Sequence, residues 1–185
     1  MIFLDFEASA GMGGYPIEVG FCMVNADRSM RSGAKLIRCD EWLDDPSRWD
    51  WRAEEIHRIT RRNLTDFGES PRKVMTWLNA ELAGMVAVAD NPMDELWMRE
   101  LAEMARISPA FGLAGDIRRA FDGPEITRIT SLEEAEKVAP KRHRAEPDAV
   151  NLATRYVLSL EPAAPVHRLH YIDGGGNERR PLSSD

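Results

Sequence analysis

The first ten residues of the chain, Met1–Ala10 (MIFLDFEASA), join an apolar run to two acids that are separated by one residue. Residues 1–6 predict a β-strand that is apolar on both faces and therefore central in a sheet. Asp5 and Glu7 stand two positions apart on this strand, so their side chains point to the same side. A lone pair of this kind is most often a solvated strand end. Adjacent carboxylates also suit a divalent cation such as Mg²⁺, so further acids decide between the two interpretations.

The composition is that of an ordinary soluble globular protein, with 185 residues, 43% hydrophobic and 30% charged. This length suits one domain with a sizeable core. No apolar run reaches about 18 residues, so we do not expect a transmembrane helix. The N-terminus has no basic segment of the kind that begins a signal peptide. Cys22 and Cys39 form no metal or redox motif. We therefore expect reduced thiols in a cytoplasmic protein.

The net charge of −7 bears on possible partners. Proteins that coat long duplex DNA neutralise many phosphates with basic side chains, and this chain is poorly suited to that. An enzyme that holds a few nucleotides in a local pocket is still compatible with the charge, because bound cations can supply the positive charge there.

Outward from the first strand, the pattern predicts further strands at residues 17–24 and 34–38, joined by short connections as in an antiparallel meander. Helices and strands then alternate, which indicates an α/β domain with a mixed sheet. The expected elements are helix 71–83, strand 85–89, helix 92–106, strand 110–114, short helix 117–121, a helix from a capping box at Ser131 to Val138, and helix 147–160.

The last 25 residues differ in composition from the rest. They contain three prolines and the run Gly174–Gly176, which indicate an extended or mobile end, although residues 167–172 (HRLHYI) could add an edge strand. We therefore predict a domain over residues 1–160 and a C-terminal tail over residues 161–185.

Two more acids follow predicted strands or loops. Asp94 ends the segment DNPMD and lies in the first turn of a predicted helix, where the helix dipole alone can explain an acid. Asp148 occupies the first turn of the late helix. His143 lies five residues before it, in a basic loop over residues 141–144 (KRHR). A loop histidine usually has no specific role.

Taken in order, these residues resemble the DEDDh exonucleases, a family that includes the proofreading subunits of bacterial DNA polymerases, ribonuclease T and oligoribonuclease. Asp5 and Glu7 match the first motif, Asp94 the second, and His143 with Asp148 the third. The resemblance extends over residues 1–160. It implies a ribonuclease H-like fold, in which helices flank a central mixed sheet of three antiparallel strands followed by parallel strands.

Two secondary stretches add to the resemblance. Ile17–Gly20 (IEVG) is similar to the I-E-x-G stretch of the second strand, and Ile56–Thr60 (IHRIT) to the H-G-I-T segment. The chain departs from the family at single positions: an arginine replaces the glycine of H-G-I-T, Met93 a phenylalanine, and Asp90 a histidine. Residues 8–11 (ASAG) replace a Thr-Thr-Gly or Met-Thr-Gly stretch. These departures concern substrate preference more than chemistry.

The resemblance implies a metal-dependent 3′–5′ exonuclease that releases 5′ mononucleotides from the 3′ end of single-stranded nucleic acid. Asp5 would bridge two ions of Mg²⁺ or Mn²⁺, with Glu7 and Asp148 on the side of the nucleophile and Asp94 on the side of the leaving group. His143 would be the general base, since histidine exchanges protons near neutral pH. A compact acidic domain favours RNA slightly over DNA.

The resemblance also implies substrate contacts. The loop after the first motif and the HRIT segment would line the pocket of the terminal nucleotide, and the basic loop would contact backbone phosphates. A solvated loop is the default explanation of such a basic run, and a buried hydrogen-bonding role explains His57 equally well. Trp49 and Trp51 could stack on bases or pack on the core. The predicted contact residues are Ala8, Ser9, Met12, His57, Asn91, Arg142 and Arg144.

Two other functions use the same fold. One is a non-catalytic nucleic-acid-binding module, which has no use for a general base such as His143. The other is a ribonuclease H-type endonuclease, against which the H-x-x-x-x-D pattern ending at Asp148 and the HRIT segment favour the exonuclease. The sequence decides neither homodimer formation nor service to a polymerase.

Overall fold

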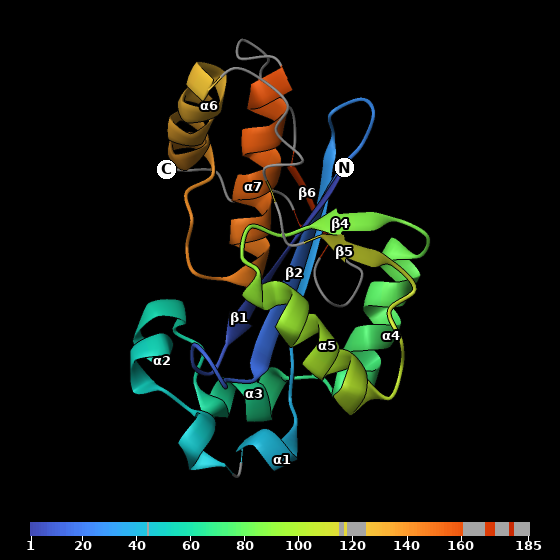
Figure 1. The fold of residues 1–185 in the computed structure, drawn as a ribbon, viewed down its shortest axis with the longest axis vertical. Helices are drawn as coiled ribbons and strands as arrows, with labels where there is room; N and C mark the ends of the chain where they lie inside the picture. The colour runs from blue at the N-terminus through green and yellow to red at the C-terminus, as the bar shows by residue number, and fades with distance from the viewer. Residues whose placement is uncertain (44, 115–116, 118–124, 161–168, 173–177, 180–185) are drawn as a thin grey trace.

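The computed structural model describes a seven-stranded sheet with helices on both faces (Figure 1). The described residues are 1–43, 45–114, 117, 125–160, 169–172 and 178–179. The strand order is β5-β4-β1-β2-β3-β6-β7. The strands are β1 Ile2–Ala8, β2 Pro16–Val24, β3 Met30–Leu36, β4 Val86–Val88, β5 Gly112–Ala114, β6 Leu169–Ile172 and β7 Glu178–Arg179.

The helices fall into three groups. The first group follows β3 and is made of short elements, α1 Asp40–Leu43, the 3₁₀ helix Pro46–Arg48, α2 Trp51–His57 and α3 Arg61–Phe67. The second is α4 Pro71–Leu82 and α5 Met93–Ala105, and the third is α6 Glu125–Val138 and α7 Ala145–Leu160. Among the described helices, none has a stretch long and apolar enough to cross a lipid bilayer.

β1 lies in the interior of the sheet, between β4 and β2, as its apolar sequence predicts. It pairs antiparallel with β2, where Asp5 lies opposite Gly20, and parallel with β4, where Ile2 lies opposite Ala87. β2 and β3 are antiparallel, and β4 and β5 are parallel. The predicted mixed sheet, three antiparallel strands followed by parallel ones, is confirmed.

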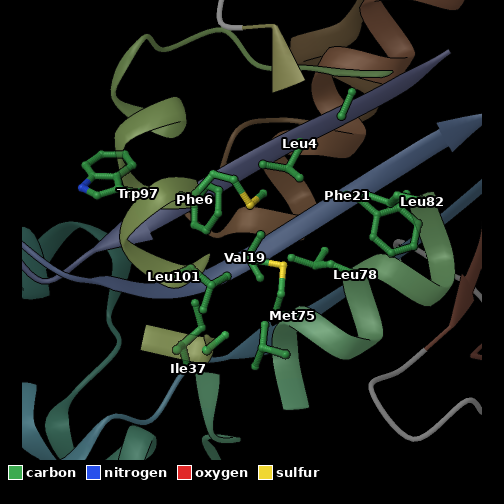
Figure 2. Close-up of a cluster of buried hydrophobic side chains, with 14 of the residues drawn as sticks. Leu4, Phe6, Val19, Phe21, Ile37, Met75, Leu78, Leu82, Trp97 and Leu101 are labelled. Carbon is green, nitrogen blue, oxygen red and sulfur yellow. The ribbon is translucent and has the colours of Figure 1, made fainter. Parts of the chain in front are cut away.

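The two faces of β1 belong to two hydrophobic clusters. Leu4 and Phe6 pack with α4 and α5 in the larger cluster, which Figure 2 shows around Val19, Phe21 and Leu78. Phe3 packs on the opposite face with residues of α7. Since side chains alternate along a strand, Asp5 and Glu7 share the α7 side of the sheet with Phe3. The strand therefore anchors both acids between two packed layers.

Several element boundaries differ from the sequence prediction. The short helices of residues 40–67 were not expected. α6 begins at Glu125, so Ser131 lies inside the helix and the predicted capping box there is wrong. β3 begins at Met30 instead of residue 34, directly after the turn. α7 begins at Ala145, which leaves Pro147 in the first turn, where its missing N–H is not needed.

The C-terminal segment takes part in the sheet where it is described. β6 pairs parallel with β3 from Leu169 opposite Met30, so a strand is present within residues 167–172. It is not at the edge of the sheet, because β7 pairs antiparallel with it on its outer side. The rest of residues 161–185, and most of the short helix expected at 117–121, lie outside the described residues. The boundary at residue 160 stays a prediction.

Candidate metal centre

Five acids from four segments converge on the α7 side of the sheet. Asp5 and Glu7 come from β1, Asp94 from the first turn of α5, Asp148 from the first turn of α7, and Asp90 from the segment after β4. They form two groups, Asp5–Asp90–Asp94 and Asp5–Glu7–Asp148. In each group, one carboxylate oxygen of every residue lies within 4.8 Å of the others. The structure thus brings together all four predicted acids and adds Asp90.

The topology explains this convergence. β1 and β4 are parallel neighbours, so the segments that follow their carboxyl ends meet at one edge of the sheet. α5 begins just after β4, at Met93, and its first turn places Asp94 beside Asp5. The N-terminus of α7 reaches the same edge from the opposite helix layer. Each acid is thus fixed by an element that is anchored in the core.

The approach of α7 to the sheet depends on Gly20 in β2. A Cβ atom built on Gly20 would lie 2.4 Å from the carbonyl carbon of Ala145 and 2.4 Å from the backbone nitrogen of Glu146. A Cβ atom this close to backbone atoms would force the helix away from the sheet, so only glycine at position 20 allows this contact. The glycine of the IEVG stretch therefore sets the position of the helix that carries Asp148.

Burial is deepest at Asp94. Its side chain is 1% exposed, and neither carboxylate oxygen has a hydrogen-bonding partner among the described residues. The backbone N–H groups of Asn91 and Phe6 lie close enough to lower the pKa of Asp94 slightly against the effect of burial, but neither makes a hydrogen bond of normal geometry to its carboxylate. Burial, followed by the charge of Asp90, raises the pKa of Asp94 to about 8. A buried carboxylate without a partner is costly in free energy, and a cation would remove that cost.

The other acids are perturbed for the same reasons. Burial raises the pKa of Asp5 well above its usual value, and the charge of Asp94 adds to the rise. Burial and the charge of Asp148 raise the pKa of Glu7 to about 8. Burial also raises the pKa of Asp148, although a backbone N–H opposes the rise. Clustered, desolvated carboxylates of this kind fit a hard cation that takes oxygen ligands.

The basic loop before α7 is anchored on both sides of His143. The backbone N–H of Arg142 donates to Oδ1 of Asp148 at 2.7 Å. Arg144 donates from Nε to Oε2 of the buried Glu18 at 2.9 Å, and the N–H of Ala145 donates to the same oxygen at 2.9 Å. His143 lies between these anchors, exposed, with a positive φ of 52°. It belongs to neither acid group, but its charge opposes the rise in the pKa of Asp148.

Two residues of this loop pair with acids, which the sequence did not predict. Arg144, expected at substrate phosphates, forms an ion pair with Glu18 of β2. Lys141 donates from Nζ to Oδ2 of Asp90 at 2.7 Å. For Arg142, no ion pair of the side chain is found within the described part of the chain. Contacts of Arg142 and Arg144 with substrate stay predictions.

The residues predicted to grip the terminal nucleotide have structural contacts of their own. Ser9 is buried, donates to the carbonyl of Arg48 at 2.7 Å and accepts from the N–H of Tyr15 at 2.8 Å. His57 is buried and accepts at Nδ1 from the N–H of Ile59 at 3.0 Å, while its Nε2 has no partner among the described residues. Their contacts with substrate stay predictions.

Three further candidates differ in exposure. Asn91 is exposed and accepts at Oδ1 from the N–H of Met93 at 3.0 Å, which places it at the start of α5. Ala8 is buried at the end of β1, whereas Met12 is 92% exposed in the loop that follows. Of these three, Met12 has the most freedom to meet a base.

The two tryptophans before His57 differ in their exposure to solvent. Trp49 donates from Nε1 to Oε2 of Glu54 at 2.8 Å and packs against the small cluster around Ile17 and Leu64. Trp51 is 61% exposed on α2. Packing therefore accounts for Trp49, and Trp51 stays a candidate for base stacking.

Asp90 is the acid that the sequence analysis did not assign to the site. The exonuclease pattern has a histidine at this position, so the resemblance assigns Asp90 no role in metal binding. The available signal was its position directly after the strand predicted at residues 85–89, since the carboxyl ends of parallel strands meet at one edge of a sheet.

Comparisons with known proteins support the fold. No protein-family model matches the chain, and no curated protein is significantly similar to it. Among solved structures, the chain is similar to a full-length 3′-exonuclease, with a TM-score of 0.63 and 16% identity, over 99% of this chain and 90% of that one. It is also similar to exonuclease I of E. coli in complex with a dT13 oligonucleotide, with a TM-score of 0.59 and 14% identity.

Exonuclease I of Methylocaldum szegediense is a further similar structure, with a TM-score of 0.60 and 12% identity, over 88% of this chain and 41% of that one. The E. coli comparison covers 88% of this chain and 40% of that one. The chain thus spans about two fifths of the length of the exonuclease I chains. These likenesses show that the chain has the ribonuclease H-like fold of 3′-exonucleases, as the sequence predicts.

Proposed function

We propose that the protein is a metal-dependent 3′–5′ exonuclease that hydrolyses phosphodiester bonds at the 3′ end of single-stranded nucleic acid and releases 5′ mononucleotides. The observation that carries the proposal is the arrangement of the acids, in which Asp5 belongs to two groups of three carboxylates on an exonuclease fold. A cluster of acids that binds no cation gives no reason to bury a carboxylate such as that of Asp94, which has no hydrogen-bonding partner among the described residues.

The chemistry of the acids fits two ions of Mg²⁺ or Mn²⁺. Glu7 and Asp148 would hold one ion, Asp94 the other, and Asp5 both. Such ions supply activation of water and stabilisation of the negative charge that grows on the phosphate and on the leaving oxygen. The proposal is consistent with the net charge of −7, because the cations offset the acids locally.

His143 is proposed as the general base. It takes a proton from the attacking water, whose oxygen forms a bond to phosphorus while the bond from phosphorus to the leaving 3′ oxygen breaks. The leaving oxygen then takes up a proton from solvent. Two anchors, Arg142 on Asp148 and Arg144 on Glu18, hold the loop backbone on either side of His143. This leaves the imidazole exposed to substrate and close to the acids.

RNA is proposed slightly ahead of DNA as the substrate, on the compact acidic form of the domain. Structures of E. coli exonuclease I contain the single-stranded DNA oligonucleotides dT13 and dA16, which makes DNA the second candidate. A cytoplasmic location and homodimer formation stay predictions.

The decisive experiment compares RNA and DNA of one sequence, single-stranded and labelled at the 5′ end, in Mg²⁺ or Mn²⁺. We expect a ladder of products that shortens from the 3′ end and is lost in Asp148→Asn, which keeps the oxygen that accepts from Arg142. The relative rates identify the preferred sugar. Internal cuts without a ladder would indicate the ribonuclease H-type endonuclease. Binding without cleavage, with metal bound, would indicate the nucleic-acid-binding module.

The role of His143 predicts a specific kinetic defect. His143→Ala should lower turnover by about 10²–10⁴-fold, the usual contribution of a general base, and leave Mn²⁺ affinity unchanged in calorimetric titrations. Arg106→Ala is a matched control, since Arg106 also has a positive φ, of 53°, at the end of α5. It should keep full turnover. An unchanged rate in His143→Ala would exclude the histidine as the base.

A further inference from the structure

We propose that Asp90 is an additional ligand of the ion at the Asp5–Asp94 side of the centre, and that Lys141 neutralises Asp90 until that ion binds. The inference rests on the metal-dependent function proposed above and assigns a residue that neither the motif pattern nor the comparisons identify. It makes this side of the centre a site of three carboxylates.

The geometry of the three acids supports the first part. One oxygen each of Asp5, Asp90 and Asp94 lies within 4.8 Å of the others, a separation that a single cation can bridge. Asp94 gives an independent indication of a ligand, because it is 1% exposed and both of its oxygens are unpaired among the described residues. Its carboxylate points into the group that contains Asp90.

The backbone holds Asp90 at this place. The N–H of Ala89, the preceding residue, donates to the carbonyl of Ala114 at 3.0 Å, so the end of β4 is fixed to β5. On the other side, the N–H of Asp94 donates to the carbonyl of Asn91 at 3.0 Å. Asp90 therefore lies on a short segment that is tied at both ends, with a side chain that is 25% exposed and can reach both the group and solvent.

Lys141 supplies a charge that a divalent ion can replace. Its Nζ lies 2.7 Å from Oδ2 of Asp90, and its backbone N–H donates to Oε2 of Glu136 at 3.3 Å, so the ammonium extends from the loop before α7 toward the acids. One ammonium offsets one of the three carboxylates. A divalent cation offsets two, and it contacts oxygens of all three. The ion and Lys141 therefore compete for Asp90.

Metal binding without nucleic acid tests this inference on the full chain. Titration with Mn²⁺ by calorimetry should show that Asp90→Asn weakens binding at one site by about tenfold or more, as loss of a supporting metal group does. Lys141→Met should strengthen binding several-fold. Asp66→Asn, which removes an exposed acid of α3 that belongs to neither carboxylate group, should bind as the wild type does.

A double variant tests the coupling. If Lys141 acts through Asp90, the gain in affinity of Lys141→Met should largely disappear in Asp90→Asn/Lys141→Met. Thermal unfolding of each variant checks that the fold is kept. In the single variant Asp90→Asn, the amide oxygen can still accept a hydrogen bond from Lys141.

The outcomes separate the two proposals. If the wild type binds Mn²⁺ and Asp94→Asn loses a site while Asp90→Asn does not, the assignment of Asp90 is wrong and the proposed function stands. If Lys141→Met binds Mn²⁺ no more tightly than the wild type, the competition is wrong. If the wild type binds no Mn²⁺ at all, the proposed function itself fails.

Discussion

Asp5→Asn is expected to abolish nuclease activity and, at the same time, to make the metal-free protein more stable. Asp5 belongs to both groups of carboxylates, so its loss weakens both sides of the centre. A single group that stabilises charge in a transition state is typically worth about 10²–10³-fold in rate, and a residue shared by two sites should be worth at least that. Activity should fall below detection in the ladder assay.

The gain in stability has an electrostatic cause. Burial and neighbouring acids make the charged form of Asp5 costly in the folded state, and asparagine has the same shape without the charge. The free energy of unfolding at pH 8 in a chelator should therefore rise, because a carboxyl whose pKa is raised on folding destabilises the folded state once it is ionised. Asp66→Asn should change neither quantity. Loss of activity together with loss of stability would show that Asp5 has a structural role instead.

The stability of the metal-free protein is expected to fall as the pH rises from about 4.5 to about 8. The pKa of Glu7 is raised from 4.5 to about 8, and that of Asp94 from 3.8 to about 8. Between these values the folded state binds more protons than the unfolded state, so stability decreases with increasing pH. The direction of the effect follows from the raised pKa values, and millimolar Mg²⁺ should restore stability at pH 8.

Urea unfolding at pH 5 and pH 8, with chelator or with Mg²⁺, measures this effect. Asp94→Asn should show a smaller difference between the two pH values, because it removes one of the groups that take up protons. Stability that is flat or rises over this range in chelator would contradict the buried, repelling arrangement of the acids.

The regular elements of the fold could be predicted because their sequences carry strong local patterns. β1 and β2 are mainly apolar, and α4 begins at Pro71, as expected of a proline in the first helical turn. The short helices between residues 40 and 67 were missed because helices of three to seven residues depend on tertiary contacts more than on their own propensity. Their caps are present in the sequence, such as the capping box of Thr60 and Asn63.

The candidate site was predictable to the extent that its residues follow a motif order. The four acids were identified from the resemblance, and their convergence is what the sheet topology produces. The partners of the basic loop were not predictable, because they depend on contacts between distant segments. Arg144 and Glu18 are 126 positions apart. Asp90 was missed because a motif describes relatives, whereas its position depends on the end of β4 in this chain.

The close contact of Gly20 with the start of α7 has a consequence for the synthesis of the protein. The ribosome makes β1 and β2 first, and it adds α7, with Asp148, only after all the other acids of the centre. Domains fold as their segments become available, so the Asp5–Glu7–Asp148 group forms when the last long helix docks on the sheet. A nascent chain that has not yet been extended past Asp148, and is still held beside its own messenger RNA, therefore lacks the complete set of acids.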